Sequence, residues 1–253
     1  MFMEFSEVNS NIKSSAKLWR YMDFTKLVNL ISTQSLYFCR SDKFKDVFEG
    51  KVFGLDKKYD FLNNTDYPGE DVKDAILKDA WGYDKAVMEY SELQRKNTFV
   101  NCWHLNEYES AAMWDLYLKS NEGIAVQTTF EKLKKSLEVC EEGIFVGKVN
   151  YIDHTTDCNY HGSTISPFFT KRLSFKHEEE VRLVYSPLAN NEDITSESKE
   201  VFGRNIKIDI SELIERVYVS PDAAPWFVEV VRVVLKKFDV NAEVVYSDLY
   251  EIK

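Results

Sequence analysis

Glu178 and Glu180 are the residues of this sequence whose type and spacing best suit catalysis. Alternate residues of a β-strand lie on one face, so a strand over residues 178–185 would place both carboxylates beside Arg182. Neighbouring carboxylates repel, which separates their pKa values and suits general-base or electrostatic catalysis. A solvated, charged strand face gives the same pattern. We predict that Glu178 and Glu180 are catalytic, with an exposed face as the alternative.

Lys171, Arg182 and Arg20 are the cations that would compensate the two glutamates. Arg20 lies in the apolar run LWRYM, and its guanidinium matches a carboxylate or another anion through two parallel hydrogen bonds. The alternative is a strand with one solvent-facing arginine, since arginine is rarely buried without a partner. We predict that these three cations bind a ligand anion or pair with the glutamates.

Two further groups combine polar and aromatic residues. Glu49 lies in an aromatic loop, where a carboxylate can contact a ligand but more often caps a helix or solubilises a turn. Trp103, Glu109, Ser110 and Trp114 surround a strand-to-helix junction, where free main-chain N–H groups bind anions and acidic residues complement the helix dipole. We keep all five as candidate ligand-binding residues.

A metal site and the common nucleotide and hydrolase motifs have little support. Asp153, His154, Cys158 and His161 lack the regular spacing of a closed zinc site, so a polar loop is the better interpretation and no metal is predicted. The motifs GxxxxGKS/T, GxGxxG, GxSxG and HExxH do not occur. P-loop hydrolysis, dinucleotide binding by a Rossmann fold and serine-hydrolase chemistry therefore lose their usual support.

Strand and helix patterns indicate which elements would position these residues. Strands are predicted where apolar and β-branched residues cluster, and helices where apolar residues recur every three or four positions. The predicted strands are 18–22, 35–40, 98–105, 123–128, 145–152, 178–185, 205–210, 216–221 and 242–249. The predicted helices are 24–31, 72–95 with a break near Gly82, 107–118, 130–137 and 225–238.

Strands and helices are mixed without a regular alternation, and no repeat or linker divides the chain. The fold class predicted is therefore α+β, with a mixed, largely antiparallel sheet and helices packed around it in a single domain. We expect a loose N-terminal segment over residues 1–15 and the domain over residues 16–253.

The chain has 42 acidic and 32 basic residues and a net charge of −10. That excess disfavours non-specific nucleic-acid binding and anionic membrane surfaces, because both depend on clustered lysine and arginine. No apolar run approaches the ~20 residues that span a bilayer, and the N-terminus lacks a secretory pattern. The four cysteines are scattered along the sequence and form no CxxC motif. A cytoplasmic location is the default expectation.

Several segments in order resemble one bacterial protein family. The run LWRYMDFTKLVNLISTQSLYFCRSDKFKDVFEG is similar to the opening of the family called domain of unknown function 2971. NCWHLNEYESAAMWDLYL, GIAVQTT, VGKVNYI, KRLSFKHEEEVRL and YVSPDAAPWF resemble later parts of it, so the resemblance covers about Leu18 to Ser247. It implies an uncharacterised bacterial protein, in some members associated with phage defence or mobile elements.

Two functions follow as hypotheses. The order of strands and the glutamate pair are similar to those of ADP-ribosyltransferases, which implies NAD-dependent transfer or NAD hydrolysis. There Arg20 or Tyr21 would hold a phosphate, Tyr37 or another aromatic residue would stack on nicotinamide, and Glu180 would stabilise the oxocarbenium-like state. The chain lacks the family's usual first-strand histidine and its Ser-Thr-Ser motif. The alternative is a non-catalytic module that senses a small anionic ligand or nucleotide, or binds a partner protein.

Overall fold

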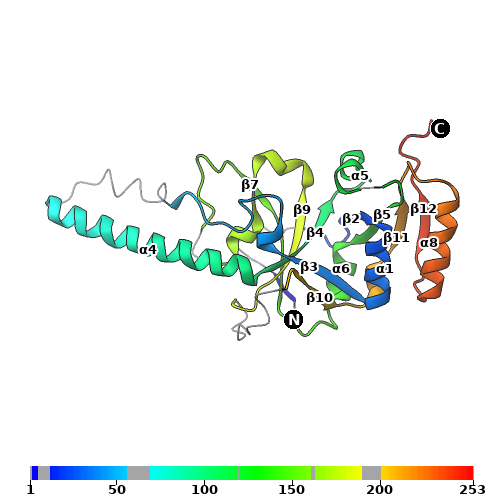
Figure 1. The fold of residues 1–253 in the computed structure, drawn as a ribbon, viewed down its shortest axis with the longest axis horizontal. Coiled ribbons are helices and arrows are strands. Elements are labelled where there is room, and N and C mark those ends of the chain that lie inside the picture. The colour runs from blue at the N-terminus through cyan, green and yellow to red at the C-terminus, as the bar shows by residue number, and fades with distance from the viewer. Residues whose placement is uncertain are drawn as a thin grey trace.

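The computed structural model describes residues 2–4, 12–55, 69–118, 120–160, 163–189 and 201–252. Its centre is a ten-stranded sheet in the order β1-β6-β9-β4-β2-β5-β11-β12, with β3 beside β4 and β10 beside β3 (Figure 1). Neighbouring strands are antiparallel except for β1 with β6 and β11 with β12. The strands are β1 (Phe2–Glu4), β2 (Lys17–Asp23), β3 (Ser35–Arg40), β4 (Phe99–Leu105), β5 (Gly123–Thr129), β6 (Ile144–Lys148), β9 (Glu180–Tyr185), β10 (Gly203–Lys207), β11 (Arg216–Val219) and β12 (Glu243–Tyr246).

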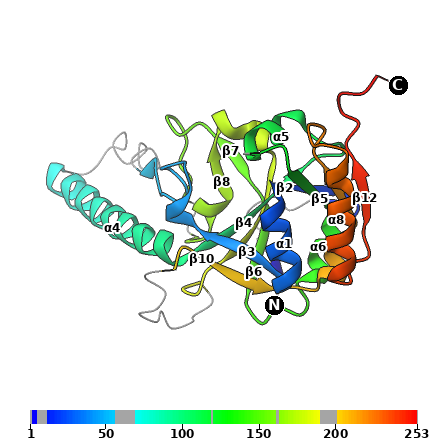
Figure 2. The same ribbon diagram turned by 45° about the vertical axis from the view of Figure 1, so that its right-hand side comes forward.

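One face of the sheet carries the main hydrophobic core, covered by four helices (Figure 2). These are α1 (Phe24–Thr33), α6 (Phe130–Ser136), α7 (Ile210–Leu213) and α8 (Trp226–Lys237). Each helix presents apolar side chains at helical spacing, as Leu27, Leu30 and Ile31 do on α1. Burial of this continuous apolar face provides the main driving force for folding.

The opposite face of the sheet is divided into two smaller apolar clusters. Helix α5 (Ala111–Tyr117) packs Met113 and Trp114 over β2 and β5. The 3-10 helix η2 (Ser166–Phe169) packs Phe168 and Phe169 against Val100 and Val184. A two-stranded parallel sheet, β7 (Asn150–Ile152) with β8 (Thr170–Arg172), and the 3-10 helix η3 (Leu173–Glu178) complete this side. The charged residues of β9 lie between the two clusters.

Helix α4 (Glu70–Asn97) extends away from the rest of the molecule at its N-terminal end (Figure 1). It runs for 28 residues and continues through Gly82, so the break predicted there is wrong. A single exposed glycine costs a helix only about 1 kcal/mol, and a Cβ at this position would meet nothing within 4 Å. Among the described residues, no helix has the length and apolar composition needed to cross a membrane.

The predicted fold class is confirmed: this is an α+β domain with a mixed, largely antiparallel sheet and helices around it. Several predicted boundaries differ. Phe2–Glu4 pair with β6 instead of being loose, while residues 5–11 lie outside the described part of the chain. The strand predicted over 145–152 divides into β6, which pairs with β9, and β7, which pairs with β8. Glu178 ends η3 instead of beginning β9.

Candidate functional site

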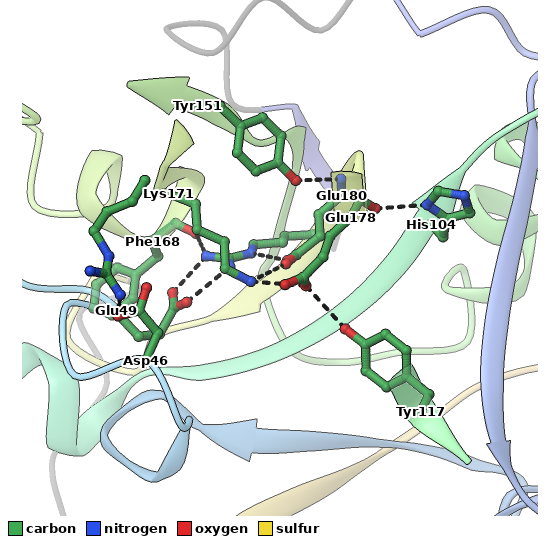
Figure 3. Close-up of polar contacts among 11 residues, drawn as sticks. Asp46, Glu49, His104, Tyr117, Tyr151, Phe168, Lys171, Glu178 and Glu180 are labelled. Carbon is green, nitrogen blue, oxygen red and sulfur yellow. Dashed lines mark hydrogen bonds and ion pairs between the residues drawn. The ribbon is translucent and has the colours of Figure 1, made fainter. Parts of the chain in front are cut away.

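Arg182 is the centre of a buried ionic cluster on the opposite face of the sheet from the main core. Figure 3 shows Glu49, Lys171, Glu178 and Glu180, which belong to this cluster. The residue exposure of Arg182 is 0%, and β9 aims it between the two apolar clusters. Nη1 and Nη2 bond the two carboxylate oxygens of Glu49 at 2.6 and 2.9 Å, Nε bonds Glu180 at 2.6 Å, and Nη1 also bonds the carbonyl of Phe168 at 2.6 Å. This bidentate, charge-assisted geometry is the strongest that arginine makes with carboxylates.

A tight turn holds Glu49 against Arg182. The carboxylate of Asp46 accepts the N–H of Phe48, and the N–H of Glu49 bonds the carbonyl of Asp46. Arg95 of α4 donates Nε to the carbonyl of Glu49 at 2.8 Å. Gly50 follows with φ +66°, and a Cβ there would lie 2.4 Å from the Phe168 ring. The glycine is therefore required both by its backbone conformation and by its packing.

Lys171 connects Glu178 to Glu180. Its Nζ bonds Glu178 at 2.9 Å and Glu180 at 2.6 Å, and lies 4.6 Å from the centroid of the Phe175 ring. Lys171, Glu178 and Glu180 are all buried. These three residues, which the sequence analysis named together, contact one another, although Glu178 reaches the others from the end of η3 and not from the strand. Glu179 between them has φ 37°, which turns the chain from η3 into β9.

The two glutamates have opposite protonation tendencies. Burial, followed by the hydrogen bond and charge of Glu180, raises the pKa of Glu178 to about 7. Burial acts on Glu180 in the same direction, but the charges of Arg182 and Lys171 outweigh it and lower its pKa. A hydrogen bond between two carboxyl groups needs one proton, and these directions assign it to Glu178. With that proton, two carboxylates (Glu49 and Glu180) balance two cations (Lys171 and Arg182).

Three rings fix the positions of the glutamates. Tyr151 of β7 accepts the main-chain N–H of Glu180 at 2.9 Å. His104 of β4 lies 2.7 Å through Nδ1 from the carbonyl of Glu178, and since a carbonyl only accepts, Nδ1 carries the proton. Tyr117 of α5 donates its hydroxyl to Glu178 Oε2 at 3.1 Å. Tyr117 is 41% exposed, whereas Glu178, which it bonds, is buried.

Arg20 lies where β2 and β3 separate along β4. β2 pairs with β4 at Leu18 and Trp19, and β3 pairs with it at Cys39 and Arg40. The carbonyl of Cys102 between these pairings accepts Nη1 of Arg20 at 2.6 Å, and the guanidinium lies 5.9 Å from the Trp103 ring. Burial lowers the pKa of Arg20, while Cys102, Tyr117 and Cys39 oppose that change.

Arg20 does not compensate the glutamates. Among the described residues, no carboxylate forms an ion pair with Arg20. The cations that pair with Glu178 and Glu180 are Lys171 and Arg182. The charge of Arg20 interacts with Tyr117, whose hydroxyl bonds Glu178. Arg20 is partly exposed as a residue, while burial of its guanidinium lowers its pKa.

Tyr21, Glu109, Ser110 and Trp114 form a separate group around the start of α5. Ser110 caps the helix, its main-chain N–H bonding the hydroxyl of Tyr21 at 2.8 Å. Glu109 Oε2 accepts Trp114 Nε1 at 3.0 Å and the hydroxyl of Ser247 at 2.6 Å. These bonds secure α5 and the C-terminal segment to the sheet. In the described part of the chain, no hydrogen bond or ion pair joins these four residues to Glu180, and their geometry is that of a helix cap. Tyr21 does contact the ring of His104, with 6.4 Å between the ring centroids.

The two remaining candidates lie apart from the ionic cluster. Trp103 is 1% exposed in the main core and donates Nε1 to Asn101 at 2.8 Å, so only its contact with Arg20 relates it to the site. Tyr37 is 44% exposed on β3, and its carbonyl accepts from Asn101. Neither ring contacts Glu178 or Glu180 through a hydrogen bond in the described structure.

Tyr117 and Tyr151 were not identified from the sequence as site residues. Tyr117 has the helical spacing of an ordinary core position, and Tyr151 is the middle residue of a three-residue strand, so neither carries a local signal. Within the described ranges, no group of three or more His, Cys, Asp and Glu side chains is arranged to hold a metal ion. His161 of the predicted polar loop lies outside those ranges.

Comparison with known proteins adds no relative: no family model, curated protein or solved structure matches the chain. The resemblance to domain of unknown function 2971 stays a prediction. Function must therefore be argued from the site itself.

Proposed function

We propose that this protein binds a small anionic ligand at the surface bordered by Arg20, Tyr117 and Glu178, and that Glu178 exchanges a proton with it. The proposal is carried by the contacts of Glu178 with Lys171 and Tyr117 together with its raised pKa. A carboxyl group with a pKa of about 7 in a buried ionic cluster is suited to acid–base work near neutral pH.

The division of roles follows from the contacts. Arg182, Glu49 and Glu180 use their charged groups in hydrogen bonds to one another. They therefore provide a fixed set of buried charges and do not contact the ligand. Lys171 fixes Glu178 from the buried side, and Tyr117 contacts it from the exposed side. Arg20 supplies the positive charge that attracts the anion. The four cysteines are free thiols, which supports a cytoplasmic setting.

Arg20→Gln tests the anion contact. We expect a screen of phosphate, mononucleotides and NAD to give a ligand that raises the melting temperature of the wild-type protein, because a ligand that binds only the folded state stabilises it. Isothermal titration should then show at least about tenfold weaker binding to Arg20→Gln, equivalent to loss of one charge-assisted contact of ~1.4 kcal/mol.

Glu109→Gln is the matched control, since it alters a carboxylate of the neighbouring helix cap but no residue of the proposed surface. It should bind the same ligand as the wild-type protein does. Equal affinity of the wild-type protein and Arg20→Gln would refute the anion contact, and absence of any stabilising anion would leave a protein-binding module as the function.

NAD cleavage is the second candidate, favoured by an ionised carboxylate next to a titrating one. In this reaction the bond between ribose and nicotinamide breaks and nicotinamide leaves as a neutral ring. The anionic charge around Glu180 would stabilise the oxocarbenium-like state, and ionised Glu178 would take the proton of the water or acceptor hydroxyl that adds to the ribose carbon. A place in phage defence or on a mobile element rests on the family resemblance.

Nicotinamide release from NAD, followed by chromatography, tests this candidate. We expect the rate to rise with pH and reach half its maximum near pH 7, where Glu178 loses its proton. Glu178→Gln should abolish the reaction, whereas Glu179→Gln, whose carboxylate pairs with Lys148, should retain it. No release at high protein concentration, or undiminished release by Glu178→Gln, would eliminate NAD cleavage and leave the binding proposal to its own test.

A further inference from the structure

Helix α4 forms one wall of a cavity of about 250 Å³ that lies outside the ionic cluster. Tyr83, Val87, Tyr90 and Gln94 follow one another at spacings of four, three and four residues, so they share a face of the helix. The facing wall includes Gly50 and Val52 from one segment and Tyr160, Thr164 and Pro167 from another. The cavity is thus bounded by three segments that are distant in sequence.

The described lining has the character of a binding site for an aromatic ring. It includes the rings of Tyr83, Tyr90 and Tyr160, and the first two are 51% and 40% exposed although they are large and largely apolar. Among the lining residues that the structure describes, none carries a formal charge. A charged ligand would lose hydration here without gaining a partner, which is costly, so the cavity favours a neutral molecule.

Hydroxyl and amide groups at the rim provide directional contacts. The hydroxyls of Tyr83 and Tyr160 lie 3.4 Å apart. Gln94 donates Nε2 to the hydroxyl of Tyr90 at 3.0 Å, while its Oε1 accepts from Thr98 and Ser186. The orientation of the Gln94 amide is therefore fixed, and the Tyr90 hydroxyl, which accepts in that bond, keeps its own proton to donate.

We propose that this cavity binds a neutral aromatic compound of one or two rings that presents a hydrogen-bond acceptor to Tyr90. Its volume exceeds the about 150 Å³ that accommodates benzene in an apolar protein cavity, and an apolar pocket with a few polar groups is the usual form of a small-molecule site. The site is separate from the proposed anion surface and does not depend on it.

Quinoline, a neutral two-ring compound with one acceptor nitrogen, is the probe, and quinoline-2-carboxylate is its charged counterpart. We expect ligand-observed NMR to show that quinoline binds the wild-type protein and that the carboxylate binds at least about tenfold more weakly, since its charge has no partner. Val87→Phe, which fills the cavity, should weaken quinoline binding to a similar degree. Tyr90→Phe should weaken it less, by loss of one hydrogen bond.

Circular dichroism and thermal melting verify that each variant folds, and Tyr90→Ala replaces Val87→Phe should the latter unfold. Arg20→Gln and Glu178→Gln should bind quinoline as the wild-type protein does, which separates this site from the anion surface. The proposal is overturned by absence of quinoline binding, by equal binding of the charged compound, or by undiminished binding to folded Val87→Phe and Tyr90→Ala.

Discussion

Arg182→Ala is expected to destabilise the protein by about 3–5 kcal/mol, the usual cost of removing one partner from a buried ion pair. The substitution would leave Glu49 and Glu180 buried without the cation that bonds both of them at 2.6 Å. Burial alone raises the pKa of both carboxyls, so each would favour its neutral form once the arginine is gone. Urea denaturation followed by circular dichroism at pH 7 measures the loss of unfolding free energy.

Arg216→Ala is the matched control for that experiment. Arg216 also lies on a strand of the sheet and pairs with Glu243 at 2.8 Å, but its side chain is 42% exposed. Exposed ion pairs contribute about 0–1 kcal/mol, so this variant should remain near wild-type stability. A change within about 0.5 kcal/mol for Arg182→Ala as well would show that the cluster is open to solvent. The double variant Arg182→Met/Glu49→Met should be less destabilised than Arg182→Ala, because it leaves fewer unpaired buried charges.

Glu178→Gln is expected to change how stability depends on pH. The pKa of Glu178 is raised from 4.5 to about 7 in the folded protein, so between these values the folded state binds more protons than the unfolded state. The stability that protonated Glu178 contributes is complete below about pH 4.5 and is lost as the pH rises through about 7. At about 1.4 kcal/mol per pKa unit, the loss amounts to about 3 kcal/mol.

Glutamine keeps the shape and cannot ionise, so Glu178→Gln should lack this decline. The difference in unfolding free energy between the wild-type protein and Glu178→Gln should therefore shift by about 3 kcal/mol in favour of the variant between about pH 4.5 and pH 8. Glu179→Gln, at the neighbouring, partly exposed position, should follow the wild-type curve. Parallel curves for the wild-type protein and Glu178→Gln would mean that Glu178 titrates as an ordinary carboxyl group.

Local patterns were sufficient to predict much of the fold. The unit of β2, α1 and β3 was predicted almost to the residue, because apolar alternation and helical spacing are both strong there. Two predictions failed where contacts distant in sequence decide the outcome. A predicted strand is divided because β6 pairs with β9 and β7 pairs with β8, and the pairing of Phe2–Glu4 with β6 orders a segment without a strong pattern of its own.

The ionic cluster was partly predictable for the same reason. Glu178, Glu180, Lys171 and Arg182 lie within twelve residues of one another, so their charges pointed to a shared site. Glu49 is 133 residues from Arg182 in sequence, and nothing in its own loop indicates that pairing. Arg20 was expected to reach the same carboxylates, but the separation of β2 from β3 directs it to the Cys102 carbonyl. Such a separation depends on strand register, which side-chain patterns alone do not specify at this position.

The protonation of Glu178 is the claim on which the proposed chemistry depends, and carbon-13 NMR of the side-chain carboxyls measures it directly. With the signal assigned by its absence in Glu178→Gln, the Glu178 carboxyl should titrate with a midpoint near pH 7, while the Glu180 carboxyl stays ionised into strongly acid solution. A Glu178 midpoint near 4.5, the value of an ordinary glutamate, would contradict the shared proton and with it the acid–base role.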